Sequence, residues 1–95
     1  MNKEEQEILN LNDPCQSYWC CYFNQNTANI KAHEEIVFNS KDPEWCYFFA
    51  RNIENSNKEL LFEVVLQSGD LKCIMAFYKL IDFDKTKYET LMLFL

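Results

Sequence analysis

The sequence is short of glycine, proline and histidine, with one Gly, two Pro and one His among its 95 residues. A β-sandwich needs a turn signal about every eight to twelve residues, so this shortage argues against that class. Catalysis needs a positioned base or nucleophile with a partner, and only His33 offers an imidazole. No local motif pairs it with Cys46 or Cys73. We therefore predict a non-enzymatic protein with His33 at a surface or half-buried helical position, and a thiol-dependent hydrolase as the enzyme alternative.

Long apolar runs and runs of basic residues are also missing. The longest apolar run, residues 91–95, is far shorter than the roughly 20 residues of a membrane span. The nine Lys and Arg are scattered, and the net charge is −6, which disfavours direct binding to nucleic-acid phosphates. An acidic surface suits attraction to a basic protein. The composition thus predicts a soluble protein with a basic protein partner, no membrane and no nucleic acid.

The cysteines are an odd number, and the polar, acidic N-terminus does not resemble a signal peptide. We therefore expect reduced thiols and a cytoplasmic location. A zinc site is disfavoured because Cys20 and Cys21 are adjacent, which points their side chains about 100° apart on a helix, and no Cys-x-x-Cys occurs. We predict no metal and no cofactor, with the thiols buried as small apolar groups. The five are Cys15, Cys20, Cys21, Cys46 and Cys73.

What the chain does have is an apolar, aromatic composition and an internal repeat. Apolar residues make up 48% of the chain and aromatic residues 16%, enough for one ordered domain with a dense core. Residues 29–53 recur without a gap as residues 57–81, at a displacement of 28. Such a period is typical of stacked supersecondary units that cannot bury their apolar faces alone. The identical pairs are Asn29/Asn57, Glu35/Glu63, Val37/Val65, Ser40/Ser68, Asp42/Asp70, Phe49/Phe77 and Ile53/Ile81.

Helix signals recur with the same period. Asp13-Pro14 and Asp42-Pro43 are N-cap and first-turn signals, and their displacement of 29 indicates a degenerate first copy with one extra linker residue. Gly69 suits a left-handed helix end, and Ser56 with Glu59 forms a capping-box pattern that predicts a helix start at Ser56. The pattern predicts helices at 3–11, 14–23, 29–39, 43–53, 57–68, 71–81 and 85–94.

These helices predict an all-α fold, a short α-solenoid of three antiparallel helix pairs plus a C-terminal helix. Helices of about ten residues are marginal alone, so each must be stabilised by its neighbours. The chain then forms a single domain with repeat copies at about 1–28, 29–56 and 57–84, followed by residues 85–95. Ser40 and Ser68 should lie at equivalent corners. Extended strands are the alternative for runs such as 60–66, although Glu63 interrupts that run.

The middle copy resembles short helix-pair repeats of about 28 residues that occur in proteins of AT-rich bacteria, their phages and large viruses. The resemblance rests on an Asn-Ile-Lys entry at 29–31, a Ser-x-Asp turn at 40–42 and an aromatic-aromatic-Ala-Arg second helix at 48–51. It extends only in part to the last copy, because residues 73–79 depart from the pattern. Such repeats usually act as binding scaffolds, and a small acidic one is similar in size, charge and composition to phage anti-defence proteins, including anti-CRISPR inhibitors.

The register of the repeat places six side chains of the second helices side by side. Tyr, Arg and Met are enriched at protein interfaces, so this strip is the predicted partner-binding surface. The alternative is that its tyrosines pack onto the neighbouring unit. The strip consists of Tyr18, Tyr22, Tyr47, Arg51, Met75 and Lys79.

The C-terminal segment is too apolar for an exposed helix, and the end unit of a solenoid needs a polar outer face. Leu91, Phe94 and Leu95 therefore either fold back on the preceding pair or join a second copy in a homodimer. The sequence thus predicts a protein-binding module, a phage-encoded inhibitor of a nucleic-acid-handling defence enzyme in the host cytoplasm. The alternative is a self-assembling scaffold repeat.

Overall fold

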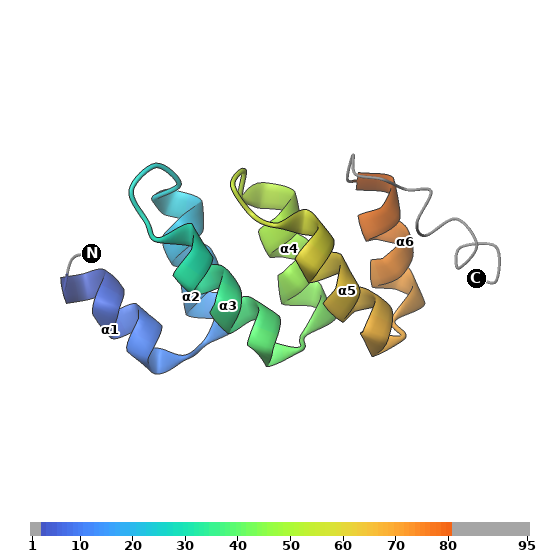
Figure 1. Cartoon of the computed structure of the whole chain (residues 1–95), viewed down its shortest axis with the longest axis horizontal. Coiled ribbons are helices and arrows are strands. Elements are labelled where there is room, and N and C mark those ends of the chain that lie inside the picture. The colour runs from blue at the N-terminus through green and yellow to red at the C-terminus, as the bar shows by residue number, and fades with distance from the viewer. Residues whose placement is uncertain (1–2, 81–95) are drawn as a thin grey trace.

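The computed structural model describes residues 3–80, which form helices and short connections without strands (Figure 1). The all-α prediction is confirmed for this part of the chain, and each predicted helix boundary agrees to within one residue. The predicted helix at 85–94, with Leu91, Phe94 and Leu95, lies outside the described residues. The helices are α1 (Lys3–Leu11), α2 (Pro14–Phe23), α3 (Ile30–Ser40), α4 (Pro43–Asn52), α5 (Lys58–Ser68) and α6 (Leu71–Leu80).

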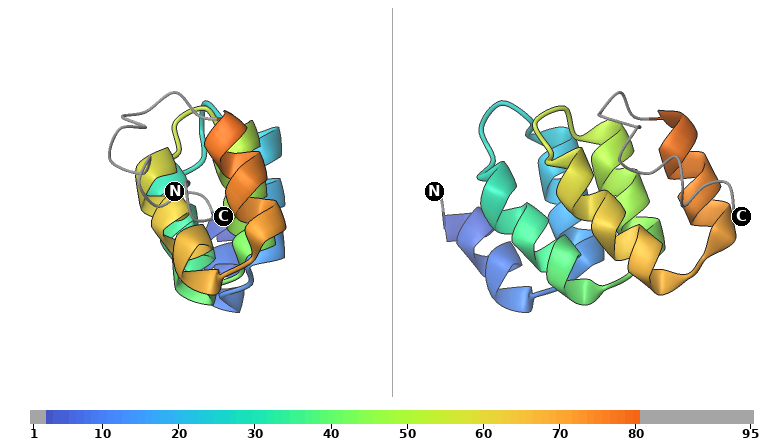
Figure 2. Two further views of the ribbon diagram at one scale, coloured as in Figure 1. Left: turned by 90° about the vertical axis from the view of Figure 1, so that its right-hand side faces the viewer. Right: turned by 45° about the vertical axis from the view of Figure 1, so that its right-hand side comes forward.

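The helices follow one another as antiparallel pairs in a row, α1/α2, α3/α4 and α5/α6 (Figure 1). Viewed along the row, α3 and α5 lie on one side and α2, α4 and α6 on the other (Figure 2). Within each side, neighbouring helices contact one another, as α2 contacts α4 and α4 contacts α6. The extents of 47 × 21 × 16 Å fit a row of short helices that are covered by their neighbours.

The corners inside the second and third pairs are equivalent, as the repeat predicts. Ser40 Oγ donates to the Val37 carbonyl at 2.6 Å and accepts from the Asp42 N–H at 3.2 Å. Ser68 makes the same two bonds, to Val65 at 2.6 Å and from Asp70 at 3.1 Å. The residue after each serine is left-handed, with φ of 59° at Lys41 and 75° at Gly69. Only the second corner uses glycine, the residue that tolerates this conformation without strain.

The entries to the first helices of these pairs are also equivalent, but they begin at asparagine. Asn29 and Asn57 are the N-caps, and their side chains accept from the N–H groups of Ala32 and Leu60. The predicted N-cap at Ser56 is wrong by one residue, because the Ser56 hydroxyl donates to the Ile53 carbonyl at 2.7 Å instead. An asparagine side chain that reaches the N–H three residues ahead makes the capping-box serine unnecessary.

Carboxylates join each pair to the next. Glu5 Oε1 accepts from the Asn29 N–H at 2.6 Å, and Glu34 Oε2 accepts from the Asn57 N–H at 2.5 Å. The two carboxylates are 29 residues apart, which is the displacement between the first and second copies. Each therefore neutralises a helix N-terminus that belongs to the following pair, where the macrodipole favours negative charge.

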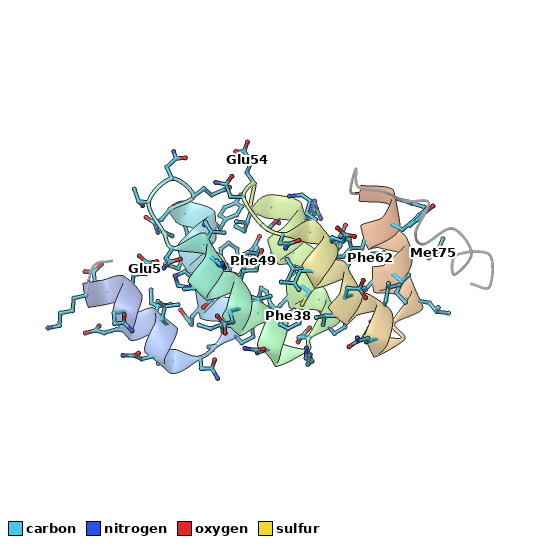
Figure 3. All side chains as sticks on the ribbon, viewed as in Figure 1. Glu5, Phe38, Phe49, Glu54, Phe62 and Met75 are labelled. Atoms are coloured by element: carbon cyan, nitrogen blue, oxygen red, sulfur yellow. The ribbon has the colours of Figure 1, made fainter. Side chains whose placement is uncertain are left out.

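The core is a continuous apolar cluster built from α2 to α6. Its largest side chains are aromatic, and the repeated pair Phe49/Phe77 is fully buried in both copies. Phe49 and Phe62 lie between helices, whereas Met75 points away from α6 (Figure 3). On α6, Phe77 lies in the core, whereas Leu71 and Met75 are exposed. The fully buried apolar residues are Cys21, Val37, Cys46, Phe49, Ala50, Ile53, Leu61, Phe62, Val65 and Phe77.

The contact from Glu34 to the next pair gives a stability prediction. Glu34→Ala leaves the Asn57 N–H without its acceptor, and we expect a loss of about 1–3 kcal/mol in the free energy of unfolding. Glu34→Gln keeps an oxygen that can accept the same bond, so its loss should be clearly smaller. Urea denaturation at pH 7 measures both. Equal losses in the two variants would contradict a role for the hydrogen bond.

Glu34 also makes a pH dependence of stability predictable. Burial raises the pKa of its carboxyl, although the Asn57 N–H and nearby lysines act in the opposite direction. The folded state therefore binds the proton more tightly than the unfolded chain does. The resulting contribution to stability is present below the ordinary pKa of about 4.5 and is lost as pH rises through the raised value.

We expect wild type to lose stability relative to Glu34→Gln as pH rises from about 4.5, since only wild type can ionise at this position. Parallel urea titrations at pH 4.5, 5.5 and 6.5 test this. A constant difference between the two proteins across the series would show that Glu34 ionisation does not affect folding.

Candidate functional site

His33 is fully buried at the contact of α1, α2 and α3, not at the predicted surface or half-buried position. Its Nδ1 lies 3.0 Å from Ser17 Oγ and its Nε2 lies 3.1 Å from Glu5 Oε1. In a neutral imidazole, Nε2–H can donate to the carboxylate while Nδ1 accepts from the serine hydroxyl. The order Ser–His–Glu resembles a hydrolase triad, but Ser17 is also fully buried. A substrate therefore cannot reach its hydroxyl, and the three side chains satisfy one another inside the fold.

The thiols do not form the predicted alternative, a pair with His33, because both ring nitrogens are engaged elsewhere. Burial raises the pKa of Cys21 and of Cys46 to about 12, and that of Cys73 to about 11. A reactive cysteine needs the opposite shift. Within residues 3–80, no group of three or more His, Cys, Asp or Glu side chains is arranged to hold a metal ion.

The structure divides the predicted partner-binding strip. Tyr18 is only 5% exposed, and its hydroxyl accepts from Asn52 Nδ2 at 2.7 Å. Tyr47 is half-buried, with its ring 6.0 Å from that of Phe77. The alternative of packing onto the neighbouring unit therefore applies to Tyr18 in full and to Tyr47 in part. The remaining members, Tyr22, Arg51, Met75 and Lys79, are exposed, and their role in binding stays a prediction.

A row of neighbouring aromatic rings runs across α2, α4 and α6 to α5 and includes Tyr18 and Tyr47 of this strip. It begins on the surface of α2 and ends at the buried Phe62 of α5, so the surface rings contact buried ones. Successive centroids are 4.9–6.4 Å apart, the range in which ring pairs attract. We call it the aromatic row: Phe23, Trp19, Tyr18, Phe48, Tyr47, Phe77 and Phe62.

At the start of the row, α2 exposes three rings, Trp19, Tyr22 and Phe23, which we call the α2 patch. Their exposed fractions are 44%, 42% and 73%. Trp19 and Phe23 are stacked at 5.8 Å, and Tyr22 meets both rings edge-on. Trp19 and Phe23 are not among the site residues predicted from the sequence. Their spacing of four residues, on a helix without a single charged residue, was the available signal.

Farther along the row, a groove of about 300 Å³ opens between α4 and α6. Its apolar lining comes from Tyr47 and Phe48 on one side and from Cys73 and Ala76 on the other. Charged residues complete the lining: Glu44, Asp70 and Lys72. The α2 patch and this α4/α6 groove both belong to the layer of α2, α4 and α6 (Figure 2).

Comparison of the chain with models of protein families, with curated proteins and with solved structures finds no match. The resemblance to helix-pair repeats therefore stays a prediction from the sequence. Across residues 3–80, the helices are too short or too polar to cross a membrane.

The different placement of the tyrosines predicts different effects of their removal. Tyr18→Ala should lower the free energy of unfolding by about 3–5 kcal/mol, since it empties a buried aromatic site and leaves Asn52 without its acceptor. Tyr22→Ala should cost less than about 1 kcal/mol because that ring is largely in water. Urea denaturation of both variants tests this assignment. A Tyr18→Ala protein as stable as Tyr22→Ala would contradict the packing role of Tyr18.

Proposed function

We propose that this chain is a non-enzymatic protein-binding module that occupies a surface of a larger, basic protein. The observation that carries the proposal is the α2 patch, in which three large rings stand in water on one uncharged helix face. Contiguous exposed aromatic groups on a soluble protein mark interaction surfaces. Buried aromatic anchors also provide most of the affinity at many protein interfaces.

The rings of the α2 patch are preorganised for binding, because they contact one another and a buried ring in the free protein. Trp19 contacts the buried Tyr18 ring at 5.0 Å, and Phe23 stacks on Trp19. Side chains held in this way lose less conformational freedom when a partner covers them. The apolar area that the partner removes from water then contributes about 25 cal/mol per Å².

The charge distribution supports a basic partner. The chain carries a net charge of −6, while α2 has no charged residue. A partner with positive charge around an apolar depression would be attracted over a distance and would then bury the rings without stranding a charge. Attraction of this kind raises the association rate more than the final affinity.

The identification of the partner as a nucleic-acid-handling defence enzyme, inhibited by a phage protein, remains a hypothesis from size, charge and composition. The rival, a self-assembling scaffold, predicts a mass that rises with concentration. Sedimentation of the purified chain separates them, because a concentration-independent monomer contradicts self-assembly.

The protein-binding proposal predicts that the α2 patch is needed for partner capture. Affinity capture from cells of the natural host, with the full chain as bait, should return a protein that the double variant Trp19→Ala/Phe23→Ala no longer retains. We expect at least about a tenfold loss, the effect of removing interface anchors. Leu60→Ala is the matched control, because Leu60 is an exposed apolar residue on α5, in the other layer.

The control must retain the same protein, and circular dichroism must show that all variants are folded. Recovery of nucleic acid or metabolites without a protein would contradict the proposal. Equal retention by wild type and the double variant would reject the α2 patch as the binding surface.

A further inference from the structure

The α4/α6 groove exists because two positions of the repeat carry large side chains on α4 and small ones on α6. The register of 28 aligns Trp45 with Cys73 and Phe48 with Ala76. Between α2 and α4, Trp45 and Phe48 fill the available space, with ring centroids 5.5 and 6.4 Å from that of Tyr18. Between α4 and α6, a thiol and a methyl group stand in their places, and a hollow of about 300 Å³ results.

The floor of the groove is aromatic. The Tyr47 and Phe48 rings contact each other at 5.8 Å and are half-buried. Small-molecule sites begin at about 300 Å³, so the hollow has room for one large side chain but not for an extended ligand. A ring placed there would meet Tyr47 and Phe48 much as Trp45 and Phe48 meet Tyr18.

The rim of the groove is acidic. Glu44 and Asp70 line it together with a single cation, Lys72. The pKa of the Cys73 thiol is raised by burial and by the negative charges of Asp70, Glu44 and Asp42. Three carboxylates therefore lie close enough to act electrostatically on this part of the lining. An occupant that brings a positive charge beside its apolar group therefore gains from this rim, and one that brings a negative charge loses.

We propose that the α4/α6 groove receives an aromatic side chain of the partner protein, carried beside an arginine or lysine. The inference rests on the proposed binding function and identifies a second contact of the same partner. Charge favours this occupant over a second copy of the chain, which has a net charge of −6 and offers rings from the uncharged α2. Residues 81–95 carry Lys87 beside Tyr88 and are the competing occupant that the test below distinguishes.

Nuclear magnetic resonance of the ¹⁵N-labelled full chain tests the proposal with defined probes. The capped dipeptide N-acetyl-Arg-Trp-amide should shift the amide signals of Tyr47, Phe48, Cys73 and Ala76 in a saturable way. N-acetyl-Glu-Trp-amide should bind at least about threefold more weakly, and N-acetyl-Arg-Ala-amide should not saturate, because the rim and the floor each contribute.

Two variants locate the site. Ala76→Phe restores the residue found at the equivalent position of α4, so it should fill the groove and weaken N-acetyl-Arg-Trp-amide at least about tenfold, one step of 1.4 kcal/mol. Leu71→Ala is the matched control on the same helix, at an exposed apolar position outside the groove lining, and should change affinity less than about twofold. Glu44→Gln, at an exposed position, should reduce the preference for the Arg-Trp probe even where Ala76→Phe fails to fold.

Three results would overturn the inference. The first is an Ala76→Phe variant that binds N-acetyl-Arg-Trp-amide as well as wild type does, or amide shifts that are largest outside the groove. The second is groove signals that move on dilution of the protein alone, since a second copy then occupies the site. The third is nuclear Overhauser effects between residues 81–95 and the Tyr47 or Phe48 ring, which show that the chain fills its own groove. Partner loss in the α2 patch variant is measured separately, so the proposed function stands or fails independently of these results.

Discussion

The hydrogen bond that the N-cap backbone N–H of one helix pair donates to a carboxylate of the preceding pair is the contact that fixes the spacing of this row. Helices of nine to eleven residues are marginal alone, so the fold depends on how their pairs meet. Glu5 accepts a hydrogen bond from the N-cap residue of α3, and Glu34 accepts one from the N-cap residue of α5. Because each bond joins a side chain to a backbone group at a helix N-terminus, it specifies one register between neighbouring pairs.

Around these bonds, the contacts between pairs change from polar to apolar along the chain. Ser17 and His33 stand beside Glu5, whereas the equivalent positions beside Glu34 are Cys46 and Leu61. Buried polar groups specify a contact because each needs its partner, but they add little net stability. The apolar contact between the later pairs contributes more hydrophobic stabilisation, with Phe49, Leu61 and Val65 fully buried there.

The sequence predicts this architecture well because its signals are local. The Asp-Pro and Ser-x-Asp signals and the period of 28 place every described helix to within one residue. The contacts between pairs were not predictable in the same way. Glu5 looked like part of a polar N-terminus, and nothing near His33 indicates that α1 and α2 enclose it. For Tyr18, both partner binding and packing onto the neighbouring unit were open from the sequence, because the register alone does not tell which equivalent side chain meets a neighbour.

The candidate site arises where the repeat departs from itself. One register position of the second helices carries Trp19, Phe48 and Ala76 in succession, so the outer face descends from a projecting ring on α2 to a hollow beside α6. A surface built from identical units would be uniform and could not distinguish one partner orientation from its reverse. A projection at one end and a hollow at the other allow a partner with the complementary arrangement to dock in one direction only. Since all three residues lie on helices held by the same core, the spacing between projection and hollow is set by the repeat itself.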